Sequence, residues 1–329
     1  MINSKLLLLL SFLFFISDVV LSQPNTDKKV SINEAIPDNI YPPEDFTLPD
    51  FDDWTKGNYK KRIKEFKANP LEYGDIVFLG NSITEFGKDW GNRFNSSIIK
   101  NRGIAGDMTA GVLARLDEIC YFKAKAVFLL IGVNDVYKNK TSEYIVENII
   151  DIVNYIHTNS PETQVFVQTI LPIYTKNTTL MTVNNLLDNY ASSNNYTVIN
   201  LYDIFANEND IIKAEYTTDG THLTEAAYNA WVEYEKIFMN SVLSNLHTIQ
   251  NHDLEFYPNP ANETLTIKGL QSTDDYKYTI YSTNGKLMIE KEKLINHELD
   301  VSILPSGQYI LLLENKTDLR HIATQFQKL

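Results

Sequence analysis

The sequence predicts an α/β fold, a three-layer sandwich with a central parallel sheet, followed by a small all-β C-terminal domain. From Asp75 to about Leu246, apolar runs of strand length alternate with segments of helical periodicity. This alternation is typical of βαβ units with helices on both faces of a parallel sheet. After Leu246 the pattern changes to short β-rich runs separated by turn residues. The 329 residues are enough for two or three such domains.

The strands expected in the sheet are short apolar runs, most of them followed closely by glycine or proline. In chain order they are Asp75–Leu79, Ser97–Asn101, Ala126–Ile131, Gln164–Ile170 and Thr197–Leu201.

The helices expected between the strands carry apolar residues three or four positions apart, which gives each helix one buried face. They lie at about Tyr59–Ala68, Ala110–Glu118, Thr141–Thr158 and Met181–Ala191, and a long helix follows its predicted N-cap, Thr224.

The ends of the chain differ from this α/β region, which we place at residues 53–246. Residues 1–22 contain Lys5, a mainly apolar run and small residues before Gln23, as in a secretory signal peptide; an N-terminal membrane anchor is the alternative. Residues 23–52 are polar and rich in proline and aspartate, and we expect a lead-in linker there. Residues 254–329 are expected to form the all-β domain, with strands near 264–267, 276–281 and 308–313.

Composition excludes several classes of function. The net charge of −13 argues against a nucleic-acid-binding protein, because such proteins present a basic face. The single cysteine, Cys120, permits no intrachain disulfide, and its apolar neighbours indicate a buried small side chain rather than a catalytic thiol. No paired Cys/His spacing of a zinc site is present, and nothing in the sequence calls for a metal or organic cofactor.

Ser82 is the candidate nucleophile, because it lies just past the carboxyl end of the first predicted strand, after the turn at Gly80. Ligands of open α/β sheets bind at this edge. An ordinary serine in a glycine turn is the alternative, and the choice depends on whether a base and hydrogen-bond donors for an oxyanion converge on the hydroxyl.

His222 is the candidate base, since it alone among the six histidines has a carboxylate at a useful spacing. Asp219, three residues earlier on a turn, can reach the imidazole and fix its tautomer. A surface Asp–His pair without function is the alternative.

Gly106 and Asn134 are the candidate oxyanion donors. They follow the second and third predicted strands, so parallel topology places them on the same rim as Ser82. Gly106 offers a backbone N–H that a ligand can approach closely, and Asn134 offers a carboxamide. A turn glycine and a loop asparagine are the alternatives.

Four ordered blocks of the sequence resemble those of the SGNH (GDSL-type) hydrolases, over about residues 73–246. The blocks are Gly80-Asn81-Ser82-Ile83-Thr84, Asn101-Arg102-Gly103-Ile104-Ala105-Gly106-Asp107, Gly132-Val133-Asn134-Asp135 and Asp219-Gly220-Thr221-His222. The resemblance implies a flavodoxin-like sheet, with Ser82 as nucleophile and His222 as base oriented by Asp219. It also implies Gly106 and Asn134 as oxyanion donors beside the Ser82 N–H. The family usually has aspartate where Asn81 stands, a departure that leaves these roles in place.

The C-terminal region has a resemblance of its own. Residues 256–261, 281–286, 299–301 and 304–309 are similar to the type IX secretion C-terminal sorting domain of Bacteroidota. With the predicted signal peptide, this implies export through the periplasm and then release or attachment at the cell surface, with the type IX machinery as a partner. A carbohydrate-binding β-sandwich is the competing interpretation.

The sequence therefore predicts a secreted serine esterase that hydrolyses short acyl esters. The resemblance lies closest to the platelet-activating-factor acetylhydrolase-like and sialate O-acetylesterase-like branch, which implies an acetylated glycan or another small acyl ester as substrate. The alternatives are a lysophospholipase or longer-chain lipid esterase or thioesterase, and, from another class, a non-catalytic surface binding protein.

Overall fold

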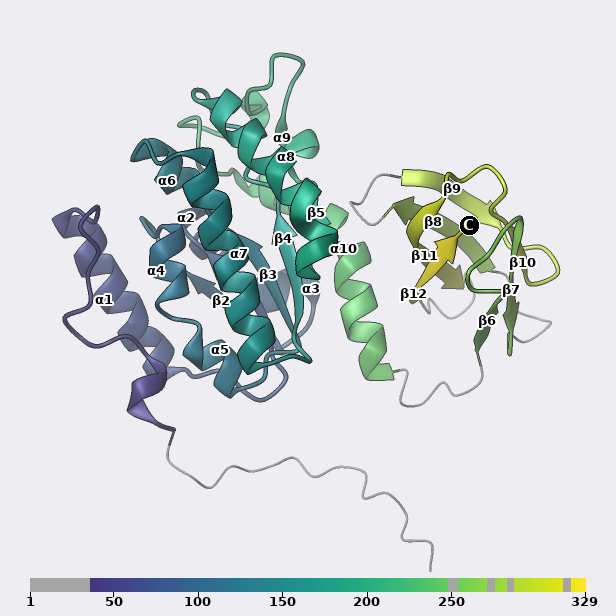
Figure 1. Cartoon of the computed structure of the whole chain (residues 1–329), viewed down its shortest axis with the longest axis horizontal. Coiled ribbons are helices and arrows are strands. Elements are labelled where there is room, and N and C mark those ends of the chain that lie inside the picture. The colour runs from purple at the N-terminus through teal and green to yellow at the C-terminus, as the bar shows by residue number, and fades with distance from the viewer. Residues whose placement is uncertain (1–35, 248–253, 271–275, 283–286, 316–320) are drawn as a thin grey trace, which may run out of the picture. The chain divides into compact units, whose positions relative to one another are not determined.

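The computed structural model describes residues 36–247, 254–270, 276–282, 287–315 and 321–329 (Figure 1). The predicted signal peptide and residues 23–35 of the predicted lead-in linker lie outside these residues. In the part of the chain that is described, no helix has the length and apolar character needed to cross a membrane.

A five-stranded parallel sheet with strand order β2-β1-β3-β4-β5 forms the centre of the α/β region. The strands are β1 (Ile76–Gly80), β2 (Ile99–Gly103), β3 (Ala126–Leu130), β4 (Gln164–Gln168) and β5 (Thr197–Ile199). All five predicted strands are present, the first two shifted by one or two residues. The strand order reverses between β1 and β3, so the topological switch point lies where the first and third strands end.

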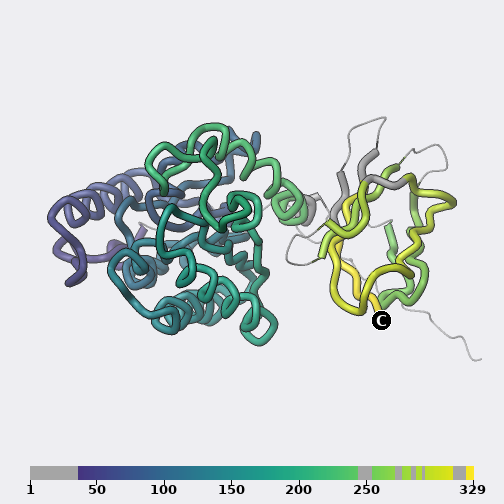
Figure 2. The backbone as a smooth tube through the Cα atoms, turned by 90° about the horizontal axis from the view of Figure 1, so that it is seen from above, coloured from purple at the N-terminus to yellow at the C-terminus, as the bar shows by residue number. Residues whose placement is uncertain are grey.

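Helices cover both faces of this sheet, as the views in Figures 1 and 2 show. They are α1 (Asp53–Ala68), α2 (Ser82–Glu85), α3 (Trp90–Phe94), α4 (Thr109–Leu113), α5 (Asp117–Tyr121), α6 (Val133–Tyr137), α7 (Ser142–Asn159), α8 (Asn177–Asn194), α9 (Tyr202–Phe205) and α10 (Glu225–His247), with 3-10 turns at Asp38–Ile40 and Ala214–Tyr216. Thr224 accepts a hydrogen bond from the Ala227 N–H at 3.3 Å, which confirms it as the N-cap of α10.

Aromatic rings fill the face of the sheet that lies under α3 and α10. The strand register aligns Phe78, Phe128 and Phe166 across β1, β3 and β4, and successive ring centroids lie 5.2 and 4.6 Å apart. Trp90 of α3 stacks on Phe78 at 4.1 Å, and Trp231 of α10 meets Trp90 edge-on at 4.9 Å. Because such large rings are buried, they fix the spacing between sheet and helices.

Two predicted helices differ from the observed ones. The helix expected at Ala110–Glu118 is two short helices, α4 and α5, because Arg115 in the break turns its guanidinium inward to form buried hydrogen bonds. Helix α1 begins at Asp53 rather than near Tyr59, since Asp52 caps it by accepting the Thr55 N–H at 2.8 Å.

The C-terminal region forms two antiparallel sheets, which confirms the predicted all-β architecture. One has the strand order β10-β7-β6 and the other β12-β11-β8-β9. The strands are β6 (Glu255–Tyr257), β7 (Thr264–Lys268), β8 (Tyr276–Ser282), β9 (Leu287–Lys293), β10 (Glu298–Asp300), β11 (Gly307–Asn315) and β12 (His321–Lys328). The three strands expected from sequence correspond to β7, β8 and β11.

Cys120 is buried in α5, as predicted. Burial raises the pKa of its thiol to about 11. At neutral pH the side chain is therefore a protonated, inaccessible thiol, and the interpretation as a catalytic nucleophile gains no support.

Candidate active site

Ser82 lies where β1 turns into α2. Its side chain is the first of the short helix α2, and Asn81 caps that helix by accepting the Ile83 N–H at 3.0 Å. Gly80, the last residue of β1, has no room for a side chain, because a Cβ there would lie 2.2 Å from the Leu130 carbonyl oxygen on β3 and 2.4 Å from Thr84 Oγ1 of α2. The side-chain oxygen of Asn81 thus accepts the hydrogen bond that an aspartate at this position would also accept. The buried Nδ2 of Asn81 has no hydrogen-bond acceptor in the described part of the chain.

The structure brings Ser82, His222 and Asp219 into one hydrogen-bonded chain. The Oγ of Ser82 lies 3.0 Å from Nε2 of His222, and Nδ1 of the same ring lies 2.7 Å from Oδ2 of Asp219. The other oxygen of Asp219 accepts the backbone N–H groups of Thr221 at 2.9 Å and His222 at 2.8 Å. One carboxylate therefore fixes both the loop and the imidazole ring.

Asp219 is an anion at neutral pH. Burial alone raises its pKa, but the hydrogen bonds from His222 and Thr221 outweigh burial and lower the pKa to about 2. A carboxylate accepts hydrogen bonds, so the Nδ1 of His222 carries a proton and donates it to Asp219. The hydrogen-bond pattern thus assigns Nε2 as the ring nitrogen that can accept the proton of Ser82.

Gly106 lies on the loop after β2, and Asn134 lies in the first turn of α6, just after β3. Nδ2 of Asn134 donates to the carbonyl oxygen of Asp107 at 2.8 Å, which leaves the second hydrogen of that amide for another acceptor. Gly106 has φ = +86°, and a Cβ there would lie 2.7 Å from Thr55 Oγ1, so both the conformation and the space require glycine. Within the described residues, the N–H groups of Ser82 and Gly106 donate to no protein acceptor.

Sheet topology places these residues together, at the carboxyl ends of neighbouring strands. Ser82, Gly106 and Asn134 follow β1, β2 and β3, which are neighbours in the sheet and all run in the same direction. Their carboxyl ends therefore form a single rim at the switch point, where α/β proteins bind ligands. Such a site can combine proton transfer from a serine with hydrogen bonds to a developing oxyanion.

Arg115 is the main residue of the site that the sequence did not reveal. Its guanidinium donates to the carbonyl oxygens of Gly80 at 3.0 Å and Arg102 at 2.8 Å, and to the carboxylate of Asp107 at 3.0 Å. Complete burial raises the pKa of Asp107 to about 6, although Arg115 opposes the shift. One buried cation therefore ties the ends of β1 and β2 to the loop that carries Gly106.

Three partly exposed aromatic side chains, which we call the aromatic collar, surround the loop of the candidate base. They come from three different segments and are 39–49% exposed. They are Phe86, Tyr137 and Tyr174, which contact His222, Thr221 and Gly220 in that order.

The described residues contain no group of three or more His, Cys, Asp or Glu side chains placed to hold a metal ion.

Comparison with known proteins places this site in a family. Residues 78–230 match the GDSL-like Lipase/Acylhydrolase family model. "Platelet-activating factor acetylhydrolase IB subunit alpha2" of Gallus gallus is 31% identical over 166 residues, which cover 47% of this chain and 71% of that protein. The chain belongs to the GDSL-like lipase/acylhydrolase family. As a GDSL hydrolase, the protein is an ester hydrolase.

Solved structures agree on the fold of this GDSL hydrolase. A structure from Streptococcus pneumonia, described as a platelet activating factor, has 27% identity and a TM-score of 0.53, covering 56% of this chain and 94% of its own. An acylhydrolase structure from Bacteroides fragilis has 22% identity and a TM-score of 0.50, covering 60% of this chain and 100% of its own, and shows the fold alone.

The C-terminal region matches a second family model. Residues 255–324 match the Secretion system C-terminal sorting domain, in agreement with the sequence-based interpretation. This domain supports secretion or export to the cell surface.

Proposed function

We propose that this GDSL hydrolase is a secreted serine esterase that removes short acyl groups, above all O-acetyl groups on glycans, through an acyl-enzyme. The observation that carries the proposal is the unbroken chain from Asp219 through His222 to Ser82, with contacts of 2.7 and 3.0 Å. Both distances are within the range in which a base can take the proton of its nucleophile.

In the proposed reaction, Ser82 Oγ bonds to the carbonyl carbon of the ester while its proton passes to Nε2 of His222. The π electrons of the carbonyl move onto its oxygen, which accepts hydrogen bonds from the N–H groups of Ser82 and Gly106 and from Nδ2 of Asn134. His222 then protonates the leaving alcohol as the carbon–oxygen bond breaks, and Asp219 stabilises the intermediate imidazolium.

The acyl-enzyme is resolved by water. His222 removes a proton from a water molecule, whose oxygen attacks the acyl carbon, and the acid leaves as Ser82 Oγ takes the proton back. Every step uses side chains and backbone groups of this chain.

Substitution of the nucleophile tests the proposal. Ser82→Ala should lower kcat for p-nitrophenyl acetate by about 10³-fold or more, since loss of a catalytic serine typically costs at least that much. A fluorophosphonate should label the parent at Ser82 and leave the variant unlabelled. Hydrolysis by Ser82→Ala at the parent rate would refute the assignment, and an unlabelled parent would favour a non-catalytic binding protein.

Several observations support a short acyl group on a large external substrate. The relative from Gallus gallus is named an acetylhydrolase. The side chains of His222 and Asp219 are 39% and 51% exposed, so a bulky alcohol can approach them from solvent. The aromatic collar offers flat apolar faces of the kind on which sugar rings stack.

The runner-up is a lysophospholipase or a longer-chain lipid esterase or thioesterase. A series of nitrophenyl esters of increasing chain length separates the two. Activity that falls steadily beyond acetate and butyrate supports our proposal, because each methylene must find its own apolar contacts. An optimum at about eight carbons or more would indicate a buried acyl channel instead.

We also propose that the signal peptide and the C-terminal domain act in sequence, through the periplasm and then the type IX secretion machinery. Deletion of residues 254–329 should leave active enzyme in the periplasm. Its appearance in the medium or on the cell surface in parental amounts would contradict this route.

A further inference from the structure

The loop that carries Gly106 needs an external support. It connects β2 to α4, and a backbone N–H can stabilise an oxyanion only if its position is fixed before the reaction. Within the loop, the Ile104 N–H donates to the Gly80 carbonyl and the Asp107 N–H to the Ile104 carbonyl, both at 3.0 Å. Ala105, directly before Gly106, is held instead by a side chain from α2.

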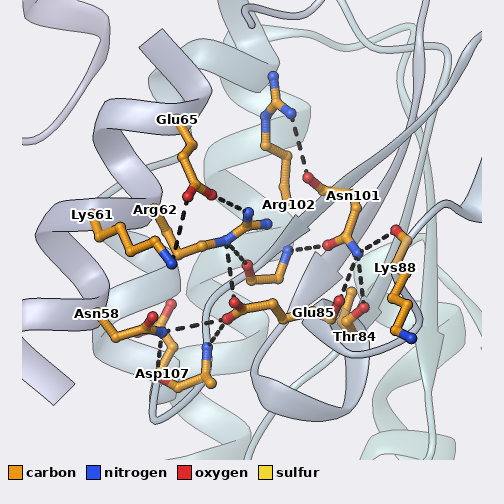
Figure 3. Close-up of polar contacts among 12 residues, drawn as sticks. Asn58, Lys61, Arg62, Glu65, Thr84, Glu85, Lys88, Asn101, Arg102 and Asp107 are labelled. Atoms are coloured by element: carbon orange, nitrogen blue, oxygen red, sulfur yellow. Dashed lines mark hydrogen bonds and ion pairs between the residues drawn. The ribbon is translucent and has the colours of Figure 1, made fainter. Parts of the chain in front are cut away.

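That side chain is Glu85, the last residue of the helix that begins at Ser82 (Figure 3). Its Oε2 accepts the Ala105 N–H at 2.5 Å, and the side chain is only 19% exposed. One carboxylate thus joins the helix of the proposed nucleophile to the residue before the proposed oxyanion donor. Charge-assisted hydrogen bonds of this kind are short and strong.

Helix α1 closes the arrangement from the other side. Nδ2 of Asn58 lies 3.2 Å from the Ala105 carbonyl oxygen and 3.4 Å from Glu85 Oε2, so it bridges the loop and the carboxylate. Arg62 donates from Nε to the Gly103 carbonyl oxygen at 3.1 Å and lies 3.6 Å from Glu85 Oε1. Figure 3 shows these side chains converging on the loop from α1 and α2.

Backbone packing leaves this loop little room to shift. A Cβ on Gly103 would lie 2.2 Å from the Glu85 nitrogen, so the end of β2 lies directly against α2. The side chain of Asn101 accepts the Gly103 N–H at 2.8 Å and donates to the Thr84 and Glu85 carbonyl oxygens at 3.0 and 3.1 Å. Glu85 is therefore fixed at its backbone and at its carboxylate.

We propose that Glu85 is a positioning residue that sets the Gly106 N–H relative to Ser82 and so assembles the oxyanion site. Glu85 touches neither His222 nor Asp219 in the described structure, and it acts through the Ala105–Gly106 peptide. The inference rests on the proposed function, since it assumes that Gly106 donates to the oxyanion. The competing view is that Glu85 is only one member of a stabilising ion-pair network with Arg62 and Glu65.

The test compares Glu85→Ala with two matched variants. In Glu85→Gln, the amide oxygen can still accept the Ala105 N–H, so this variant should recover most of the activity that Glu85→Ala loses. Glu65→Gln removes a carboxylate that pairs with Arg62 at 2.5 Å but does not reach the loop, so its kcat should equal that of the parent.

For Glu85→Ala we expect kcat for p-nitrophenyl acetate to fall by up to about 10²-fold with KM unchanged, because a small displacement of a catalytic group can cost that much. Concentrations are normalised to sites titrated with a fluorophosphonate, so unfolded protein does not count. A second readout is the affinity for trifluoroacetone, whose carbonyl carbon bonds to Ser82 Oγ while the hydroxyl proton passes to His222 and the carbonyl oxygen becomes an oxyanion. This affinity should fall by the same factor as kcat.

The outcomes separate the two levels of inference. Parental kcat and parental trifluoroacetone affinity in Glu85→Ala, together with an inactive Ser82→Ala, overturn the positioning role alone. A loss in Glu65→Gln as large as that in Glu85→Ala also overturns it, because it would point to the ion-pair network. Activity retained by Ser82→Ala overturns the proposed function, and the role of Glu85 with it.

If Glu85→Ala does not fold, Asn58→Ala provides a second test, because it releases the Ala105 carbonyl. This variant should lower kcat and trifluoroacetone affinity together, and parental values of both would count against the proposal.

Discussion

Removing the carboxamide of Asn134 should separate catalysis from stability. Asn134→Ala deletes one proposed oxyanion donor, and the loss of one such donor typically lowers kcat by about 10²–10³-fold, or ~2.7–4 kcal/mol. The same change deprives the Asp107 carbonyl oxygen of its 2.8 Å hydrogen bond. A neutral hydrogen bond contributes about 1 kcal/mol to stability. We therefore expect a fall in Tm of only about 2–4 °C, as for a domain of roughly 200 residues.

The assay measures kcat and KM on p-nitrophenyl acetate and Tm by circular dichroism. Asn148→Ala is the matched control, because Asn148 donates from its Nδ2 to Thr109 Oγ1 at 2.9 Å and, within the described residues, forms no hydrogen bond with the proposed catalytic groups. It should lose similar stability and retain its kcat. A loss of kcat below tenfold in a folded Asn134→Ala, or equal losses in both variants, would refute the assignment of Asn134 to the oxyanion.

Three further predictions concern carboxylates. Asp219→Asn should lower kcat by about 10⁴-fold at neutral pH, as when the orienting carboxylate of a serine triad becomes an amide; a loss below tenfold would show that the half-exposed carboxylate is dispensable. Glu235 is fully buried in α10, its two oxygens accept no hydrogen bond of ordinary geometry from the described residues, and burial raises its pKa well above the usual range. Glu235→Met should therefore raise Tm, since an unsatisfied buried polar group costs about 1–3 kcal/mol, and a lower Tm would contradict this. Burial raises the pKa of Asp135 from 3.8 to about 6, so this carboxyl group costs stability above pH 6 and progressively less as the pH falls toward 3.8. When the pH is lowered from 7 to 5, the Tm of the parent should rise relative to that of Asp135→Asn. A difference in Tm that stays constant over this range would argue against the raised pKa of Asp135.

The sheet could be predicted from sequence because its strands carry their own signal. The three central strands β1, β3 and β4 are mainly apolar, and burial on both faces demands such a run in a parallel sheet. The edge strand β2 carries the polar residues Lys100, Asn101 and Arg102, and its signal is correspondingly weaker. The pairing of Asp219 with His222 was equally accessible, since three residues on a turn place the two side chains together. The link from this pair to Ser82 depended on topology and on the family resemblance.

The supports of the site could not be predicted, because their partners are far apart in the chain. Arg115 reads as an ordinary polar position of an amphipathic helix, and only the folded chain shows that it breaks this helix to reach the Gly80 carbonyl. Glu85 likewise resembles a solvent-exposed helix residue, yet it receives the Ala105 N–H from across the loop. No local pattern specifies such contacts, since they depend on how separate elements pack.

The hydrogen bond between Ser82 and His222 has a practical use as a reporter of folding. The two residues are 140 positions apart in the chain. Ser82 follows β1, the first strand of the sheet, and His222 lies just before α10, the last helix of the α/β region. A chain that has formed only part of the sheet lacks either the environment of the proposed nucleophile or the proposed base. Turnover of a simple nitrophenyl ester should then measure the fraction of chains in which the α/β domain is complete, and could follow its assembly during refolding or after export without any spectroscopic label.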